Sequence, residues 1–411
     1  MSDGPYPGLR PFRRDETDIF FGRESQVDEL LERLDRGRFL AVLGPSGCGK
    51  SSLVLTGLLP ALEAGFLAEG ANRWLIAAMR PGKSPLRGLS NALLEAGVLG
   101  DNTPSREDHD GRAEHAAHIQ ATLERGPLGI QDVLNRYPLS CGARLLLLVD
   151  QFEEVFRYQR EASRDEADRF VNLVLESAGI VDWPVYVVIT MRSDFLGDCA
   201  RFMGLPEAIN KALFLTPRLT RSQLRDAIEA PAAMFGAGLA PELTNRLLND
   251  MTGGQDQLPI LQHLLQRMFT LAKQRLAGSA VAADAVSVSA IELTLDDYRR
   301  VGGMRGALSR HADEAFESLE TPRDKAIARQ MFALLTERRE DWRDIRRPCR
   351  LLEVAEVCQV PHQRIAKVAE AFRGPDRSFL MPSRRDQPAL LADSFVDISH
   401  ESLIRQWKRL S

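Results

Sequence analysis

The sequence predicts an α/β domain with a parallel sheet covered by helices on both faces, followed by an all-α helical domain and a winged-helix domain. Three observations lead to this prediction. Short apolar runs alternate with helical patterns up to about residue 215, only helical spacing continues to about residue 320, and three helices then precede two short strands. We place the domains at residues 1–216, 217–320 and 321–411.

Four apolar runs in the first domain have the length of buried strands and are bounded by Gly, Pro or polar residues. They are Arg38 to Leu43, Trp74 to Met79, Arg144 to Val149 and Val185 to Met191. Continuous apolar strands separated by helices are typical of a parallel sheet that is buried on both faces. Residues 101–124 are rich in charged residues and predict an exposed insertion with one polar helix.

In the second domain, helical spacing predicts four helices, over Thr220 to Phe235, Pro241 to Met251, Leu258 to Leu276 and Leu295 to Leu319. The small residues of Ala277 to Ser289 predict a loop. In the third domain, we expect helices at Lys325 to Thr336, Leu351 to Cys358 and Pro361 to Phe372, strands at Ser378 to Pro382 and Ser394 to Ile398, and a final helix at His400 to Leu410. Three helices followed by a β-hairpin is the winged-helix pattern.

Composition excludes several classes of protein. The 411 residues carry a net charge of −4 and only 7% are aromatic, so neither nucleic-acid binding nor an anionic membrane partner is expected. The five cysteines are widely spaced without a C-x-x-C pair, which favours a reducing compartment over a disulfide framework. The N-terminus has no signal-peptide pattern and the longest apolar runs are strand-sized. We therefore expect a soluble cytoplasmic protein without a membrane segment.

The strongest motif lies between the first predicted strand and a helix. Residues 44–51 match G-x-x-x-x-G-K-[ST], in which backbone N–H groups and a helix N-terminus surround phosphates. Lys50 is predicted to reach the β- and γ-phosphates and Ser51 to hold Mg²⁺. The first domain is therefore predicted to be a P-loop NTPase domain. The predicted cofactor-binding residues here are Gly44, Pro45, Ser46, Gly47, Cys48, Gly49, Lys50, Ser51 and Ser52.

Two later strands deliver polar residues to the same edge of the sheet. Asp150 ends the strand of RLLLLVD and is a predicted Mg²⁺ ligand. Glu153 and Glu154 follow, and one of them is predicted to orient or deprotonate the attacking water, although the residues alone leave open which. Arg192 ends the next strand and is predicted to sense the γ-phosphate, with a salt bridge to Asp194 as the alternative. The guanine-reading N-K-x-D motif is absent.

The order of these motifs resembles the STAND class of signalling P-loop NTPases, in particular the bacterial novel-STAND branch that is often fused to β-propeller repeats. The likeness runs through YPGLRPF (residues 6–12), FFGRE (20–24), the phosphate loop, LLVDQFEEVF and TMRSDF. It continues through AIEAPA (227–232), LPILQHLL (258–265), YRRVGGMRGA (298–307) and ISHESLIRQW (398–407). It thus covers nearly the whole chain.

The resemblance implies roles for residues that spacing does not reveal. It places Phe21, Gly22 and Arg23 by the adenine, and it implies that Pro259, after Leu258, packs on the adenine. The family's usual glycine two residues before that proline is replaced by Gln257, which departs from the pattern of the local backbone. His400 is implied to contact the β-phosphate of ADP. The acid at the position of Glu154 is the usual catalytic candidate in related proteins, which ranks it above Glu153.

These motifs predict an ATP/ADP-controlled molecular switch with slow ATPase activity. The resemblance implies that the ATP form oligomerises and activates an effector in bacterial defence or other signalling, with effector and sensor acting in trans or lying outside this chain. One alternative is a turnover ATPase that does remodelling work. Another is a DNA-binding regulator that uses the winged helix.

Two further clusters have simpler interpretations. His109, His115 and His118 lie close together in the predicted insertion, but no cysteine or second ligand pair lies close by in sequence, so a metal site is not expected. The segment Arg338 to Arg350 holds six arginines together with acidic residues. It favours a solvated face or a strand of the winged helix over a DNA-reading surface.

Overall fold

The computed structural model describes residues 4–66, 73–105, 107–158, 164–251, 256–280, 291–338, 344–374 and 376–409. The chain forms two compact units, one of Arg23–Arg218 and the other of Met1–Gly22 together with Leu219–Ser411. The expected boundary after residue 216 lies two residues from the observed one. Residues 1–22, which we expected in the first domain, belong instead with the C-terminal part of the chain.

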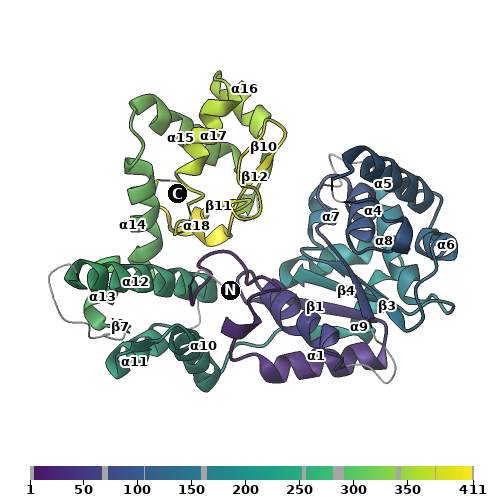
Figure 1. Ribbon diagram of the computed structural model, residues 1–411, viewed down its shortest axis with the longest axis horizontal. Helices are drawn as coiled ribbons and strands as arrows, with labels where there is room; N and C mark the ends of the chain where they lie inside the picture. The colour runs from purple at the N-terminus through teal and green to yellow at the C-terminus, as the bar shows by residue number, and fades with distance from the viewer. Residues whose placement is uncertain are drawn as a thin grey trace. The chain divides into compact units, whose positions relative to one another are not determined.

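The first unit contains a five-stranded parallel sheet in the order β2-β3-β4-β1-β5. Strands β1, β4 and β3 of this sheet are labelled in Figure 1. The strands are β1 (Phe39–Gly44), β2 (Arg73–Met79), β3 (Ala143–Val149), β4 (Val185–Arg192) and β5 (Leu213–Leu215). Four of them match the predicted runs. The three-residue edge strand β5 was not predicted, because so short a segment carries no periodic signal. The register sets Gly44 of β1 beside Arg192 of β4, so the strands end together.

Helices cover both faces of this sheet, as predicted. On one face, Leu40 and Val42 of β1 pack with residues of α1 and the helical segment after the phosphate loop. On the other face, Ala41 and Leu43 of β1 pack with residues of α4, α6 and α8. This alternation explains why the strands are apolar throughout. The helices are α1 (Glu24–Arg36), α2 (Lys50–Ser52), α3 (Leu59–Glu63), α4 (Pro85–Glu95), α5 (His109–Leu123), α6 (Gly129–Arg136), α7 (Glu154–Tyr158), α8 (Arg164–Ala178) and α9 (Leu205–Lys211).

The predicted polar insertion forms α5, whose few buried residues include Ile119 and Leu123. Shorter helical turns lie at Gly100–Asn102 and Ser193–Arg201, and a π-helical stretch at Leu53–Leu58 joins α2 to α3.

The second unit begins with helices that largely follow the predicted ranges. They are η1 (Thr17–Ile19), α10 (Arg221–Met234), α11 (Pro241–Asp250), α12 (Gln257–Ala280), α13 (Leu295–Val301) and α14 (Gly303–Glu317). The single helix expected over residues 295–319 is wrong, because Gly302 and Gly303 both have positive φ, at 97° and 61°, and end α13 before α14 begins. Helix α12 continues through the first four residues of the loop expected at 277–289. The rest of that loop lies outside the described residues.

The expectation of an all-α segment here is also incomplete. Two three-residue strands, β6 (Ala237–Leu239) and β7 (Ile291–Leu293), form a parallel pair. Strands of this length are too short to show the alternation by which a strand is predicted from sequence.

The C-terminal part combines four helices with short strands. It contains α15 (Pro322–Leu334), β8 (Thr336–Arg338), β9 (Asp344–Arg346), β10 (Cys349–Arg350), α16 (Leu351–Cys358), α17 (His362–Glu370), β11 (Leu380–Met381), β12 (Phe395–Ile398) and α18 (Glu401–Gln406). The predicted hairpin strands pair antiparallel as β11 and β12, and β10 extends the sheet on the other side of β12. The last helix is shorter than the expected 400–410. The winged-helix assignment stays a prediction.

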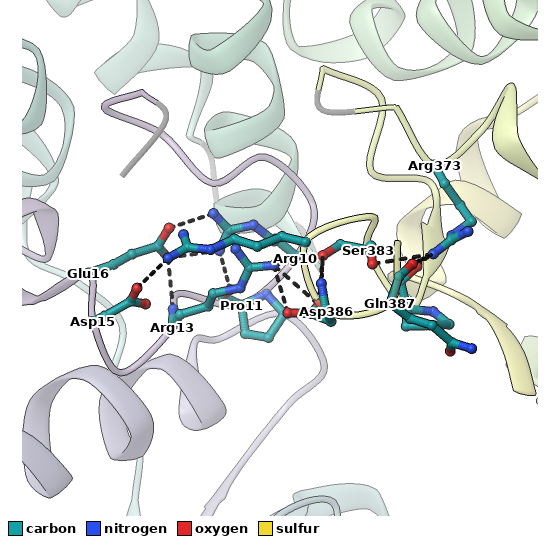
Figure 2. A network of polar contacts seen from close by, with 11 residues as sticks. Arg10, Pro11, Arg13, Asp15, Glu16, Arg373, Ser383, Asp386 and Gln387 are labelled. Atoms are coloured by element: carbon teal, nitrogen blue, oxygen red, sulfur yellow. Dashed lines mark hydrogen bonds and ion pairs between the residues drawn. The ribbon is translucent and has the colours of Figure 1, made fainter. Parts of the chain in front are cut away.

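The N-terminal segment (residues 4–22) joins both cores of the second unit. The buried Tyr6 hydroxyl donates a hydrogen bond to the Ile228 carbonyl of α10 at 2.5 Å, whereas Leu9 packs into the core of the C-terminal helices and strands. Figure 2 shows Arg13 donating to Ser383 and Asp386 at 2.7 and 3.0 Å. These contacts explain why the segment belongs to this unit.

The loop that Arg13 contacts is supported by the buried Arg373. The Arg373 side chain has no exposed surface, and its guanidinium donates to the carbonyls of Pro382 and Gln387, each at 2.6 Å (Figure 2). Its ion partner is Glu370, which also pairs with Arg384. Arg373 therefore fixes the loop from inside the unit.

We expect Arg373→Ala to destabilise this unit by about 3 kcal/mol, because it removes a fully buried side chain and leaves partly buried carbonyls and a carboxylate without their donor. The matched control is Arg384→Ala, which removes a half-exposed arginine from the same Glu370 and is expected to cost less than about 1 kcal/mol. Thermal unfolding of both variants measures the difference. Equal unfolding temperatures would show that Arg373 does not support the fold.

Among the helices within the described ranges, none is long and apolar enough to cross a membrane.

Candidate nucleotide and magnesium site

The phosphate loop runs from the end of β1 into α2, as its motif requires. Gly47 and Gly49 have φ values of 71° and 94°, which side-chain-bearing residues rarely adopt. A Cβ on Gly44 would lie 2.7 Å from the Cys48 sulfur, so a side chain at this position would force Cys48 to shift. The Lys50 ammonium donates to the carbonyls of Gly44 and Pro45, each at 2.9 Å. Lys50 therefore lies across the loop that carries it.

Arg23 fixes this loop from the side. Its guanidinium is buried and donates to the Cys48 carbonyl at 2.9 Å and to the Pro217 carbonyl at 2.8 Å. Burial lowers the pKa of Arg23, and the electrostatic interaction with Cys48 opposes this shift. The resemblance placed Arg23 by the adenine. In this structure the side chain supports the backbone of the phosphate loop.

Asp150 follows β3 directly and lies beside Ser51. The Ser51 hydroxyl donates to Asp150 Oδ1 at 2.6 Å, and the Thr190 hydroxyl of β4 donates to the same oxygen at 2.7 Å. Asp150 is buried, so its position is held by these donors. Hydroxyl and carboxylate oxygens are ligands that Mg²⁺ accepts together with phosphate oxygens and water. The pair predicted to hold Mg²⁺ therefore lies together and fits that ion.

Glu153 is also buried at this edge of the sheet. Its Oε2 accepts a hydrogen bond from the Arg192 backbone N–H at 3.3 Å. Burial raises the pKa of Glu153 to about 7, and the positive charges of Lys50 and Arg192 oppose the rise. A carboxyl group with a pKa near neutrality can accept a proton at physiological pH.

Glu154 is oriented differently. Its Oε2 accepts a hydrogen bond from the Gly82 backbone N–H at 3.0 Å, in the loop after β2. The Arg192 side chain is engaged by Asp194, with Nη2 to Oδ2 at 2.6 Å. This is the salt bridge that the sequence offered as the alternative to γ-phosphate sensing. Lys50 and Arg192 both act electrostatically on Glu153, and the backbone N–H of Arg192 donates to its carboxylate.

Sequence reasoning missed two residues of this site. Arg80 follows β2 and its Nε lies 3.2 Å from Asp150 Oδ2, and Thr190 holds the other oxygen of the same carboxylate. The sequence did contain a signal for Arg80, because this residue directly follows a predicted strand. Asp150 and Arg192 were predicted from the same kind of position, at the end of a strand. Thr190 lies inside an apolar strand, and nothing in the sequence distinguishes it.

The remaining predicted site residues, Phe21, Gly22, Leu258, Pro259 and His400, belong to the second unit. Phe21 is half-buried, and a Cβ on Gly22 would lie 2.4 Å from the Gln223 carbonyl oxygen. Leu258 and Pro259 lie in the first turn of α12 and are half-buried. The replacement of the family's glycine by Gln257 is accommodated, because the positive φ of 58° falls on the preceding Asp256.

His400 caps α18. Its Nδ1 accepts a hydrogen bond from the Ser402 N–H at 3.1 Å, and burial lowers its pKa. A neutral ring with Nδ1 as acceptor carries its proton on Nε2. Arg405 of the same helix forms an ion pair with the buried Asp256, at the start of α12. Within this unit the structure therefore connects the segment of Leu258 and Pro259 to the helix that His400 begins.

The structure also describes parts of the two clusters that were given simpler interpretations. Within the described ranges, no group of three or more His, Cys, Asp or Glu side chains could hold a metal ion. In the arginine-rich segment, Arg346 is buried and paired with Asp397 at 2.7 Å and Glu401 at 2.9 Å. Residues 339–343 of that segment lie outside the described residues.

The fold and the site together define an α/β P-loop NTPase domain. The chain matches the family model of Novel STAND NTPase 1 over residues 5–411, and it belongs to that family. This membership confirms the resemblance to STAND-class P-loop NTPases. No curated protein matches the chain.

The solved structures that the chain matches include three at low sequence identity. A Drosophila ORC structure bound to DNA is 14% identical, with 97% of this chain and 90% of that chain covered and a TM-score of 0.41. The Aeropyrum pernix ORC2 protein in ADPNP–ADP complexes is 12% identical, with coverage of 100% and 95% and a TM-score of 0.44. A Walker-type ATPase of Pyrococcus abyssi is 12% identical, with coverage of 97% and 99% and a TM-score of 0.37.

Proposed function

We propose that this chain is an ATP/ADP-controlled switch with slow ATPase activity. The observation that carries the proposal is the convergence of Lys50, Ser51 and Asp150 at one edge of the sheet, in a member of a STAND NTPase family. In the proposed cycle, the ADP form is the closed resting state and the ATP form is the open signalling state. Hydrolysis of ATP returns the protein to rest.

Each group at the sheet edge has a proposed part in this cycle. The N–H groups of the phosphate loop and the Lys50 ammonium bind the phosphates. Ser51 and Asp150 hold Mg²⁺, which supplies positive charge to the phosphate oxygens. A buried glutamate beside them accepts a proton from the attacking water. Arg192 exchanges Asp194 for the γ-phosphate, since a guanidinium can pair with either anion.

The proposed resting state also uses residues of the second unit. Pro259 packs on the adenine and His400 donates a hydrogen bond to the β-phosphate of ADP. The contacts of His400 support this role, because its Nδ1 accepts from Ser402 and leaves the proton on Nε2, which can donate to an anion. The Asp256–Arg405 ion pair supports it further, because it ties the two segments to each other. A switch from 1:99 to 99:1 requires about 5.5 kcal/mol of differential binding between the two nucleotides.

The proposal extends to assembly and partners. The open form associates with other copies of this chain and activates an effector, in bacterial defence or another signalling setting, with the effector and the sensor in trans or on a longer polypeptide. Steady-state kinetics separate this switch from a remodelling ATPase, whose kcat would lie in the ordinary range of about 1 to 1000 per second. The burial of Arg346 against Asp397 and Glu401 disfavours the alternative of DNA recognition through the arginine-rich segment.

The experiment that tests the switch is nucleotide-dependent mass measurement. We expect wild-type protein to be monomeric with ADP and to form larger species with ATP and Mg²⁺, as measured by mass photometry. The Lys50→Ala variant should remain monomeric in both conditions, because it lacks the phosphate-binding ammonium. Identical monomers of the wild type with ADP and with ATP would contradict the proposed switch.

A further inference from the structure

The loop of Arg80, Pro81 and Gly82 contacts two acids of the site. Strand β2 pairs in register with β3, with Met79 beside Val149, so the residues that follow the two strands meet. Arg80 Nε lies 3.2 Å from Asp150 Oδ2, and the Gly82 N–H donates to Glu154 Oε2 at 3.0 Å. One short loop therefore touches both the predicted magnesium ligand and a candidate catalytic acid.

The two partners in the Arg80–Asp150 ion pair differ in their exposure to solvent. The Asp150 side chain is 7% exposed, so its negative charge needs a compensating charge or hydrogen bonds in the absence of metal. The Arg80 side chain is 42% exposed, and its guanidinium can therefore return to water at little cost. The other oxygen of Asp150, Oδ1, accepts hydrogen bonds from the Ser51 and Thr190 hydroxyls. Arg80 is thus a compensating cation that can leave Asp150 at little cost.

We propose that Arg80 is a positioning residue that neutralises Asp150 until Mg²⁺ replaces it. This inference rests on the proposed nucleotide site and adds a regulatory step to it. When Mg²⁺ arrives with the nucleotide, the two cations compete for one carboxylate, and Arg80 moves away from Asp150. Because Gly82 is two residues further along, this movement also disturbs the hydrogen bond that holds Glu154. Arg80 therefore couples metal loading to the position of that acid.

The coupling is measured by the affinity for a fluorescent ADP analogue with Mg²⁺ and with EDTA. In EDTA, Arg80→Ala leaves the Asp150 charge uncompensated, and the carboxylate then repels phosphate. With Mg²⁺, the same variant removes a competing cation. We therefore expect the ratio of the dissociation constant in EDTA to that in Mg²⁺ to rise by about fivefold in Arg80→Ala. Arg80→Lys, which keeps the positive charge, should restore most of the wild-type ratio.

Arg87→Ala is the matched control, since it removes an exposed arginine from the neighbouring helix α4, and its ratio should equal that of wild type. An unchanged ratio in Arg80→Ala would overturn the inference. A reduced ratio would also overturn it, because it would show that Arg80 helps to bind the nucleotide when Mg²⁺ is present. A wild-type protein that binds no ADP in either condition would instead contradict the proposed nucleotide site itself.

Discussion

Replacing Lys50 with alanine is expected to weaken the binding of ADP and ATP by about 100- to 1000-fold. The reason is the local charge balance. Asp150 contacts Ser51 and Glu153 is under the influence of Lys50, and Lys50 is the cation carried by the loop itself, within 2.9 Å of the Gly44 and Pro45 carbonyls. Without it, phosphates enter a site dominated by acids. Isothermal titration calorimetry with each nucleotide and Mg²⁺ measures the loss.

The control for this variant is Lys211→Ala, which removes an exposed lysine at the end of α9 in the same unit. It should bind nucleotide like wild type. Unfolding temperatures measured without nucleotide should be similar for the two variants, because Lys50 is only half-buried and its two hydrogen bonds are to backbone carbonyls of its own loop. Affinity within about threefold of wild type in Lys50→Ala would contradict the assignment of the phosphate site.

The main features of the first unit were predictable from its sequence because its buried strands are long apolar runs. Four strands and their helices on both faces follow from that pattern alone. Several of the failures across the chain have identifiable physical causes. Strands β5, β6 and β7 have three residues each and are defined by pairing rather than by periodicity. The N-terminal segment belongs to the second unit through Tyr6, Leu9 and Arg13, whose partners lie more than 200 residues away.

The site was predictable where a motif or a strand end identifies a residue. Lys50, Ser51 and Asp150 lie together as their motifs require. The role of Arg23 in holding the Cys48 carbonyl was not predictable, because the guanidinium recognises a backbone oxygen that leaves no trace in the sequence. Arg80 was predictable in principle, since the rule that identified Asp150 applies equally to the end of β2.

The two glutamates show what the structure adds to the sequence. The resemblance ranks Glu154 first, but the structure gives Glu154 a backbone donor, the Gly82 N–H, and gives Glu153 the electrostatic influence of Lys50. A general base needs a pKa near the working pH and a place beside the reacting phosphate. The pKa of Glu153 is raised to about 7 by burial, which meets the first requirement. We therefore propose Glu153 as the base and expect Glu154 to act on the loop of Gly82.

Glu153→Gln is accordingly expected to lower kcat for ATP hydrolysis by about 1000-fold, because the amide cannot accept the proton of water. ATP affinity should stay close to that of wild type, since the amide and the neutral acid have the same shape and charge. Glu154→Gln is the matched comparison and should keep kcat within about tenfold of wild type. Single-turnover hydrolysis of radiolabelled ATP measures both variants. A thousandfold loss in Glu154→Gln with little change in Glu153→Gln would reverse the assignment.

The pH dependence supplies an independent readout. The deprotonated carboxylate is the active form of a base, so kcat/KM of the wild type should rise with pH and level off above the pKa of Glu153, which is about 7 in the free protein. About a tenfold lower value is expected one pH unit below that pKa, and the residual activity of Glu153→Gln should not show this step. Removing Lys50 removes one of the charges that hold this pKa down, so the step should move to higher pH in Lys50→Ala if its residual activity is measurable. A wild-type profile that is flat between pH 6 and 8 would exclude Glu153 as the group that accepts the proton.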